Sequence, residues 1–349
     1  MTDPWNRLEA AFPSQARQPD APRQAPLLDV RGLRTAFHTE AGAWPAVDGV
    51  DLSVRRGEIL GLVGESGSGK SVTGFSLLGL IDPPGEVVEG EIRFDGQDLR
   101  ALDEEQMRQL RGNRIAMIFQ DPLMTLNPVL RIEEQMLEAI QAHAPVARRE
   151  ALRRCVEALE MVGIPAPEKR LRSYPHEFSG GMRQRVAIAI AMLNKPDLII
   201  CDEPTTALDV TIQGQILYRM QKICREHGTA LIWITHDLGV VAELADRVAV
   251  MYAGRIVESG PVAQVLEAPR HPYTRGLLES MPARALPGAR LPQIEGMAPS
   301  LAARPVGCAF RPRCPSAVTR CAEQAPAPVQ EGERGYRCYV PLAPISQNS

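Results

Sequence analysis

The chain has 349 residues, with 39 lysines and arginines against 42 aspartates and glutamates, a formal net charge of -3 and a pI near 6.1. This length accommodates about two domains. Because the charge is so nearly balanced, nucleic acid is not the partner we expect by default. Hydrophobic residues make up 44% and charged residues 23%, so we expect most of the chain to fold.

No segment resembles a membrane span or a secretion signal. The longest apolar run, at positions 186–193, has eight residues, whereas a helix that crosses the hydrocarbon layer takes about 20. Residues 1–14 carry acidic and proline interruptions where a signal peptide needs a basic end and an apolar core. We therefore expect no membrane span and a cytoplasmic location, in which the seven cysteines stay reduced.

The first part of the chain changes character near residue 27. Residues 1–26 hold five prolines and predict a flexible lead-in. Short segments of branched residues between glycine-containing turns, at 27–56, predict antiparallel strands, and Asp95-Gly96 predicts a hairpin turn. These patterns indicate an antiparallel β subdomain.

A second kind of strand is predicted at Ile59–Val63, at 198–201 and at Ala230–Thr235. Each is an apolar run followed directly by polar residues. Such runs are typical of buried parallel strands, and ligands bind beyond the carboxyl ends of parallel strands. The sequence therefore predicts an α/β sheet with its site at that edge.

Two further blocks are distinguished by composition. Residues 122–178 predict a helical subdomain, in which Leu152, Val156, Leu159 and Val162 share one face and Gly163 stops the helix. The last 69 residues hold 11 prolines, too many for long helices. We expect a core domain at 27–280 and a C-terminal extension at 281–349.

A phosphate-binding loop is the strongest chemical signal. Residues 64–71 read Gly-Glu-Ser-Gly-Ser-Gly-Lys-Ser, which matches G-x-x-x-x-G-K-S/T between a predicted strand and a predicted helix. Lys70 is expected to reach the β and γ phosphates of ATP, and the Ser71 hydroxyl to ligate Mg²⁺. The predicted ATP-binding residues here are Gly64, Glu65, Ser66, Gly67, Ser68, Gly69, Lys70, Ser71 and Val72.

Two acids and a histidine follow the other buried strands. Asp202 is expected to face Mg²⁺, and Glu203 to polarise the water that attacks the γ-phosphate. The alternative is that both acids only cap the next helix. His236, at the end of the Ala230–Thr235 strand, is a candidate partner of the γ-phosphate and the water.

Residues 178–185, Phe-Ser-Gly-Gly-Met-Arg-Gln-Arg, open an apolar-periodic helix and resemble the signature sequence of ATP-binding cassette (ABC) ATPases. Phe37 is placed like the aromatic residue that stacks on adenine, and Gln120 like the glutamine that joins the Mg²⁺ shell. His236 resembles the switch histidine, and Asp209 lies in a run similar to the loop at the cassette dimer interface. The resemblance, which covers about residues 27–265, implies a P-loop NTPase cassette with an active site.

The signature turn needs a phosphate from elsewhere, because one cassette has one phosphate loop. Ser179, Gly180 and Gly181 form a second glycine turn at a predicted helix start, which favours anions. The family resemblance implies that this turn closes over the ATP of a second, head-to-tail cassette. Binding and hydrolysis of ATP then shift the equilibrium between closed and open cassette dimers.

The kind of ABC protein is indicated by what the chain lacks and by its tail. The spacing between Lys70 and Ser179 leaves no room for a long coiled coil, and one cassette disfavours tandem translation factors. Residues 269–278 and 307–315 look like the C-terminal extension of oligopeptide and dipeptide importer ATPases, a group that includes some nickel importers. This implies a peripheral subunit on the cytoplasmic face of the inner membrane, with two permeases, a paralogous second cassette and a substrate-binding protein.

Four of the seven cysteines lie within 31 residues of the tail, spaced C-x5-C-x6-C-x16-C. Four thiolates suit an iron–sulfur cluster or Zn²⁺, and the spacing alone does not choose between them. The family resemblance implies a structural [4Fe-4S] cluster. Free buried thiols, or disulfides formed on oxidation, are the alternatives. The candidate ligands are Cys308, Cys314, Cys321 and Cys338, whereas Cys155, Cys201 and Cys224 predict small core residues.

A nucleic-acid-processing ABC ATPase with a metal module is the alternative function. Its support is a group of arginines in the tail, which we interpret instead as solvated charges around a metal site. Salt-dependent binding to duplex DNA would favour this alternative, whereas co-purification with membrane subunits would favour a transporter. The arginines are Arg304, Arg311, Arg313 and Arg320.

Overall fold

The structure is a computed structural model that describes residues 25–40, 42–205, 210–281 and 292–343. Its larger sheet has eight strands in the order β11-β12-β10-β9-β3-β8-β7-β6, and the neighbours from β9 to β6 are parallel. Every residue of β3, β7 and β8 is buried, as expected of strands covered on both faces. The parallel strands are β3 Ile59–Val63, β6 Ile115–Ile118, β7 Leu198–Asp202, β8 Ala230–Thr235 and β9 Arg247–Tyr252.

The smaller sheet is antiparallel, in the order β2-β1-β4-β5. Asp95 and Gly96 have φ of +52° and +82°, the paired left-handed conformation of a two-residue hairpin turn, and they join β4 to β5 as predicted. Helix α2, Lys70–Leu77, links the sheets: the hydroxyls of Thr35 in β1 and Ser76 in α2 lie 2.7 Å apart. The strands are β1 Leu28–Thr39, β2 Gly42–Val54, β4 Gly85–Phe94 and β5 Gln97–Asp98.

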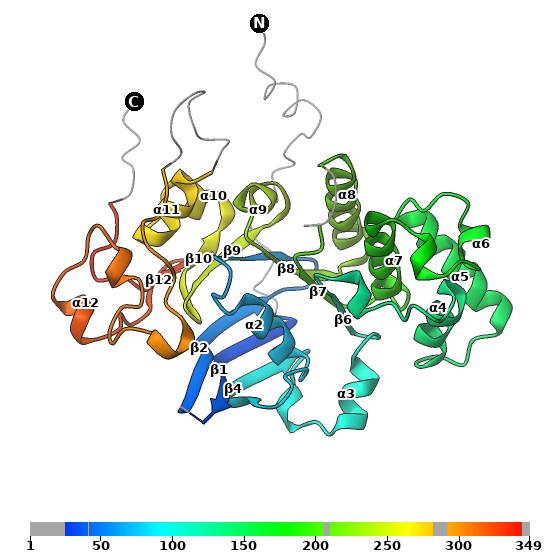
Figure 1. The fold of residues 1–349 in the computed structure, drawn as a ribbon, viewed down its shortest axis with the longest axis horizontal. Coiled ribbons are helices and arrows are strands. Elements are labelled where there is room, and N and C mark those ends of the chain that lie inside the picture. Colours follow the sequence, from blue (N-terminus) through cyan, green and yellow to red (C-terminus); the bar gives the residue numbers. More distant parts are fainter. Residues whose placement is uncertain (1–24, 41, 206–209, 282–291, 344–349) are drawn as a thin grey trace, which may run out of the picture.

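The predicted helical block forms one end of the molecule, and the C-terminal extension lies at the other end (Figure 1). Gly163 ends α5 as predicted: its φ is +73°, its N–H donates to the Glu160 carbonyl, and the Ile164 N–H donates to the Leu159 carbonyl. This pair of bonds is the Schellman motif. The helices of the block are α4 Ile132–Gln141, α5 Arg148–Met161 and α6 Pro167–Arg170, and α7 Gly180–Met192 follows the block.

The remaining helices lie between or after the strands along the chain. Helices α8 and α9 follow β7 and β8, the two strands that end in polar residues. None of the helices in the described ranges is long and apolar enough to cross a membrane. The helices are α3 Glu104–Leu110, α8 Val210–His227, α9 Leu238–Leu244, α10 Val262–Glu267, α11 Pro272–Glu279 and α12 Arg320–Glu323.

The C-terminal extension adds a hairpin to the larger sheet. Strand β12, Arg334–Tyr336, pairs antiparallel with β10, Arg255–Pro261, and with β11, Val329–Glu331. The Glu258 carboxylate of β10 is fully buried and accepts from the Arg334 guanidinium at 2.6 Å. Because two backbone N–H groups also donate to it, this buried charge is satisfied. The tail thus has a source of order besides its cysteines.

Asp48 of β2 is a second buried carboxylate that the tail reaches. Its oxygens lie 3.0 Å from Arg34, 2.7 Å from Arg255 and 2.8 Å from Arg304, which belongs to the extension. Burial disfavours the charged form of the Asp48 carboxyl group and so raises its pKa. Arg255, Arg304 and Arg34 outweigh this effect and hold the pKa of Asp48 below its ordinary value. The folded state therefore favours the charged form of Asp48.

We expect Asp48→Asn to lower the free energy of unfolding by about 3 kcal/mol at neutral pH, because shielded arginines lose their shared counter-charge. Since folding depresses this pKa, the stabilisation is present above the unfolded pKa of about 4 and is lost as pH falls through the folded value. Urea unfolding of both proteins should show a constant difference from pH 7 to 5 that shrinks below about pH 4. Glu91→Gln, which removes an exposed pair with Arg93, should change stability little; an equal loss in both variants would contradict the prediction.

Candidate nucleotide-binding site

The phosphate loop connects β3 to α2, and its shape requires glycine at two positions. Gly64 has a φ of +158°, and a Cβ there would lie 2.1 Å from the Met251 carbonyl oxygen. Gly69 has a φ of +102°, and a Cβ there would lie 2.4 Å from the Ala46 carbonyl oxygen. The loop can therefore pass this close to β2 and β9 only without side chains at these positions.

Lys70 is buried at the start of α2. Its Nζ donates to the carbonyl oxygens of Gly64 at 2.8 Å and Glu65 at 3.0 Å. Burial lowers the pKa of Lys70, and nearby carboxylates oppose this shift. The Ser68 hydroxyl is also buried and has no partner within the described ranges. A buried ammonium beside an unpaired hydroxyl in a glycine loop fits phosphate oxygens.

Asp202 ends β7 and meets the first turn of α2. Its Oδ1 accepts from the Ser71 hydroxyl at 2.9 Å. Burial raises the pKa of Asp202, and the Ser71 hydrogen bond and the Lys70 charge partly offset this rise. A buried carboxylate next to a serine hydroxyl is a pair of oxygen ligands that suits Mg²⁺ beside a phosphate.

Glu203 has a φ of +45°, a strained conformation for a non-glycine residue. Its backbone N–H donates to the Ile234 carbonyl at 3.0 Å. One carboxylate oxygen lies 3.3 Å from His236 Nδ1, and the other accepts from Gln120 Nε2 at 3.4 Å. The structure thus brings together predicted residues that follow the three neighbouring strands β6, β7 and β8.

Two other predicted groups do not join this cluster in the structure. Phe37 lies in β1 beside Gly85, where an added Cβ would be 2.8 Å from its ring. Ser179 and Gly180 are exposed at the start of α7, where the Ser179 hydroxyl caps the helix by accepting from the Met182 N–H. Asp209 lies outside the described residues.

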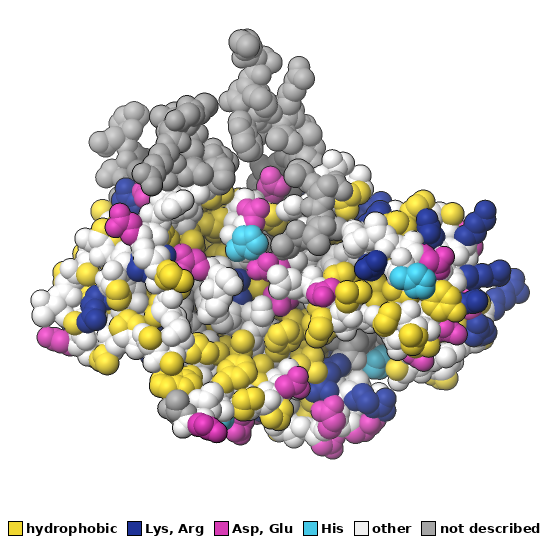
Figure 2. All heavy atoms as spheres, viewed as in Figure 1, with side chains coloured by type: hydrophobic (Ala, Val, Ile, Leu, Met, Phe, Trp, Pro, Cys, Tyr) yellow, Lys and Arg dark blue, Asp and Glu magenta, His cyan; other side chains and the backbone are white. Residues whose placement is uncertain are grey.

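The interpretation of the tail arginines is wrong for two of them. Arg304 and Arg313 have side chains 15% and 6% exposed, and they pair with the carboxylates of Asp48 and Glu65. On the face in Figure 2, Lys and Arg gather at the end formed by the helical block and do not form a continuous stripe. Two of the four arginines behind the nucleic-acid alternative are therefore neutralised within the chain.

Sequence reasoning missed Tyr273, which helps to hold the phosphate loop. Its hydroxyl accepts from the Glu65 N–H at 2.9 Å. No local signal pointed to this contact, because the Tyr273 hydroxyl binds a backbone N–H that lies 208 positions away in the chain. Glu65 itself does not reveal that the extension supplies its cation.

The four tail cysteines gather, and none forms a disulfide. The Cys308 N–H donates to the Cys321 carbonyl at 2.8 Å. Burial raises the pKa of the Cys338 thiol, and the charges of the other three thiols raise it further. However, no three His, Cys, Asp or Glu side chains in the described ranges are arranged to hold a metal ion. Cys155, Cys201 and Cys224 are buried in the core, as predicted.

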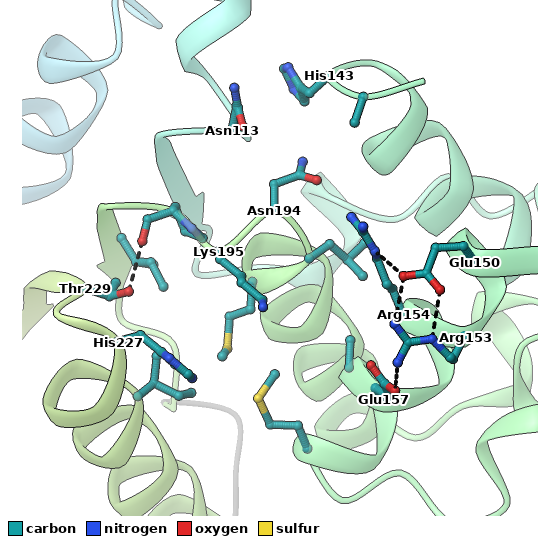
Figure 3. A pocket seen from close by; sticks show the side chains of 18 residues that line it. Asn113, His143, Glu150, Arg153, Arg154, Glu157, Asn194, Lys195, His227 and Thr229 are labelled. Carbon is teal, nitrogen blue, oxygen red and sulfur yellow. Dashed lines mark hydrogen bonds and ion pairs between the residues drawn. The ribbon is translucent and has the colours of Figure 1, made fainter. Parts of the chain in front are cut away.

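A cavity of about 480 Å³ lies away from the phosphate loop (Figure 3). Asn194, Lys195 and Thr229 line it just before the amino ends of β7 and β8, whereas Asp202 and His236 lie at the carboxyl ends of these strands. The cavity is therefore separate from the nucleotide-binding site.

The phosphate loop, the paired acids and the sheet that positions them define a P-loop nucleotide-binding cassette. The dimeric structure of MJ0796, a bacterial ABC transporter cassette, is similar, with a TM-score of 0.62 and 27% identity over 67% of this chain and 98% of that chain. The family described as ABC transporter matches residues 47–206. The family described as oligopeptide/dipeptide transporter, C-terminal region, matches residues 257–321.

Two relatives extend the similarity to most of the chain. The oligopeptide transport ATP-binding protein OppD of Bacillus subtilis is 51% identical over 302 residues, which are 86% of this chain and 84% of OppD. The dipeptide transport ATP-binding protein DppD of Escherichia coli is 46% identical over 318 residues, 90% of this chain and 97% of DppD. The chain belongs to the family of oligopeptide and dipeptide ABC transporter ATP-binding proteins.

We expect Gly69→Ala to weaken ATP binding at least about 10-fold, because left-handed backbone costs an alanine about 1–2 kcal/mol before the clash with Ala46 is counted. Titration with a fluorescent ATP analogue measures the affinity. Gly32→Ala is the matched control: Gly32 also has a positive φ, +58°, but an added Cβ meets nothing within 4 Å. Unchanged affinity in Gly69→Ala would show that the loop tolerates the side chain.

Proposed function

We propose that this chain is the ATP-hydrolysing subunit of an ABC importer that takes up dipeptides or oligopeptides through separate membrane subunits. The observation that carries the proposal is the joint match of the cassette and the C-terminal extension to proteins named for oligopeptide and dipeptide transport. The assembled acids and the phosphate loop support an active ATPase. The chain acts as a peripheral subunit on the cytoplasmic face of the inner membrane.

Each site residue has a proposed task. The loop residues 64–72 bind the phosphates of ATP, with Lys70 at the β and γ phosphates. Ser71, Asp202 and Gln120 would hold Mg²⁺, which neutralises charge on the phosphates when bound. Glu203 orients and polarises the attacking water, and His236, 3.3 Å from Glu203, contacts the water and the γ-phosphate. Phe37 stacks on adenine.

A second cassette, a paralogue in our proposal, completes the site. Ser179, Gly180 and Gly181 begin a helix, and the first two are exposed, which leaves this turn accessible to a phosphate from another chain. Asp209 contributes to the same interface. One similar solved cassette is a dimer bound to ADP and Pi.

The cassettes drive transport through two permease subunits, and a substrate-binding protein delivers the peptide. The segment after Gln120 supports a docking role, because it exposes large apolar side chains before helix α4 begins. These are Leu123, Met124 and Val129, whose exposed fractions are 55%, 73% and 75%. Exposed apolar residues that cluster in this way favour protein contacts.

Glu203→Gln tests the assigned chemistry. We expect the variant to bind ATP, to lose hydrolysis by at least about 100-fold, and to accumulate as a closed dimer, because the amide cannot polarise water as a carboxylate does. Phosphate release in the assembled transporter measures hydrolysis, and size-exclusion chromatography of the cassettes with ATP, without the permeases, measures dimer closure. Glu226→Gln, which alters an exposed pair with Lys222 on α8, should behave as wild type. Normal turnover in Glu203→Gln would refute the role of Glu203.

The tail cysteines are proposed to hold a [4Fe-4S] cluster, with Zn²⁺ as the alternative. Four thiols of suitable chemistry gather in one segment, and backbone N–H groups lie near three of their sulfurs, as is common around thiolate-bound metals. A bound metal would add structural order to the Cys-rich extension. The candidate ligands are Cys308, Cys314, Cys321 and Cys338.

We expect anaerobically purified protein to show a broad absorption shoulder near about 400 nm that Cys314→Ser loses, because the cluster would lack one ligand. Visible spectra together with iron and zinc analysis measure this. Cys224→Ala, which changes a cysteine buried in the core, should keep the shoulder. If the wild-type protein were colourless and contained stoichiometric zinc, the cysteines would bind Zn²⁺ and not an iron–sulfur cluster.

A further inference from the structure

The carboxylate of Glu65, inside the phosphate loop, is held by Arg313 of the C-terminal extension, 248 positions later in the chain. Nη1 lies 2.6 Å from Oε2, and Nη2 lies 3.0 Å from Oε1. Such a bidentate pair fixes the orientation of both groups. Because the Arg313 side chain is 6% exposed, salt in the solvent screens the pair weakly.

Arg313 is itself held in place. Its Nε donates to the Glu295 carbonyl at 3.0 Å, and Nη2 donates to the Ile294 carbonyl at 3.3 Å. Nη1 donates to the Tyr252 hydroxyl at 3.4 Å, and the guanidinium lies 5.9 Å from the centroid of the Tyr252 ring. A guanidinium with this many partners is a rigid support for Glu65.

Glu65 joins this support to the nucleotide-binding lysine. Its carbonyl accepts from Lys70 Nζ at 3.0 Å, and its N–H donates to the Tyr273 hydroxyl at 2.9 Å. The Tyr273 ring packs against Phe310, with centroids 5.3 Å apart. Since Phe310 precedes Arg313 by three residues, one short segment of the extension supports Glu65 at both its backbone and its carboxylate.

We propose that Arg313 is a positioning residue for the phosphate loop. It fixes Glu65, and through the Glu65 backbone it preorganises the loop in which Lys70 meets the phosphates of ATP. The inference rests on the ATPase function proposed above. Because Arg313 supports the loop from outside and preorganisation contributes to affinity, its loss weakens nucleotide binding more than it slows turnover of bound ATP.

The test is a double-mutant cycle in the full-length protein with a fluorescent ATP analogue. Arg313→Gln and Glu65→Gln are each expected to raise Kd about 10-fold, and the double variant no further, because both changes break the same pair. Arg313→Lys keeps the positive charge but cannot form the bidentate pair, so its Kd should lie between those of wild type and Arg313→Gln. In the assembled transporter, the KM for ATP should rise in Arg313→Gln while kcat changes less.

Arg311→Ala is the matched control, because Arg311 lies in the same turn and the described part of the chain gives it no carboxylate partner. It should bind the analogue as wild type does. The proposal is overturned if Arg313→Gln binds within twofold of wild type, even with a lowered melting temperature, or if the two single effects multiply in the double variant. Should Arg313→Gln not fold, the same criteria apply to Arg313→Lys. A wild-type chain that binds no analogue would contradict the ATPase function instead.

Discussion

The burial of the Lys70 ammonium is the constraint on which the site depends. A cation removed from water needs oxygen partners, and the loop provides them by curling so that two carbonyls face Nζ. That curl brings the backbone against β2 and β9, which is why Gly64 and Gly69 cannot carry side chains. The opposing charges of Asp202 and Glu203 then fall beside Lys70, because parallel strands end at one edge of the sheet.

The loop is also held from outside the motif. The Gly254 N–H, in the turn between β9 and β10, donates to the Ser68 carbonyl, and the Gly254 carbonyl accepts from the Asp48 N–H. Tyr273 and Arg313 hold Glu65 from the C-terminal part of the chain. The conformation that suits phosphate is therefore a property of the whole cassette, and eight loop residues alone do not determine it.

The features that sequence predicted well are those with local causes. Continuous apolar runs predicted β3 and β8 to the residue, the dipeptide Asp95-Gly96 predicted its turn, and Gly163 predicted the end of α5. Glu203 and His236 were grouped from their positions after buried strands, but adding Gln120 required the family resemblance, because Gln120 follows β6, a strand that was not predicted. The environments of Arg304 and Arg313 were predicted wrongly. Their carboxylate partners lie far away along the chain, so in the sequence these arginines look like solvated charges.

The tail shows that a change in composition along the chain does not separate parts that stabilise each other. Its prolines predicted a boundary near residue 281, yet three of its arginines neutralise carboxylates of the cassette. Arg334 meets a fully buried Glu258, Arg304 meets Asp48, and Arg313 meets Glu65. Without the tail these acids would lose counter-charges in shielded places, which is costly whatever the cysteines bind. The extension is thus coupled electrostatically to β10, to β2 and to the phosphate loop.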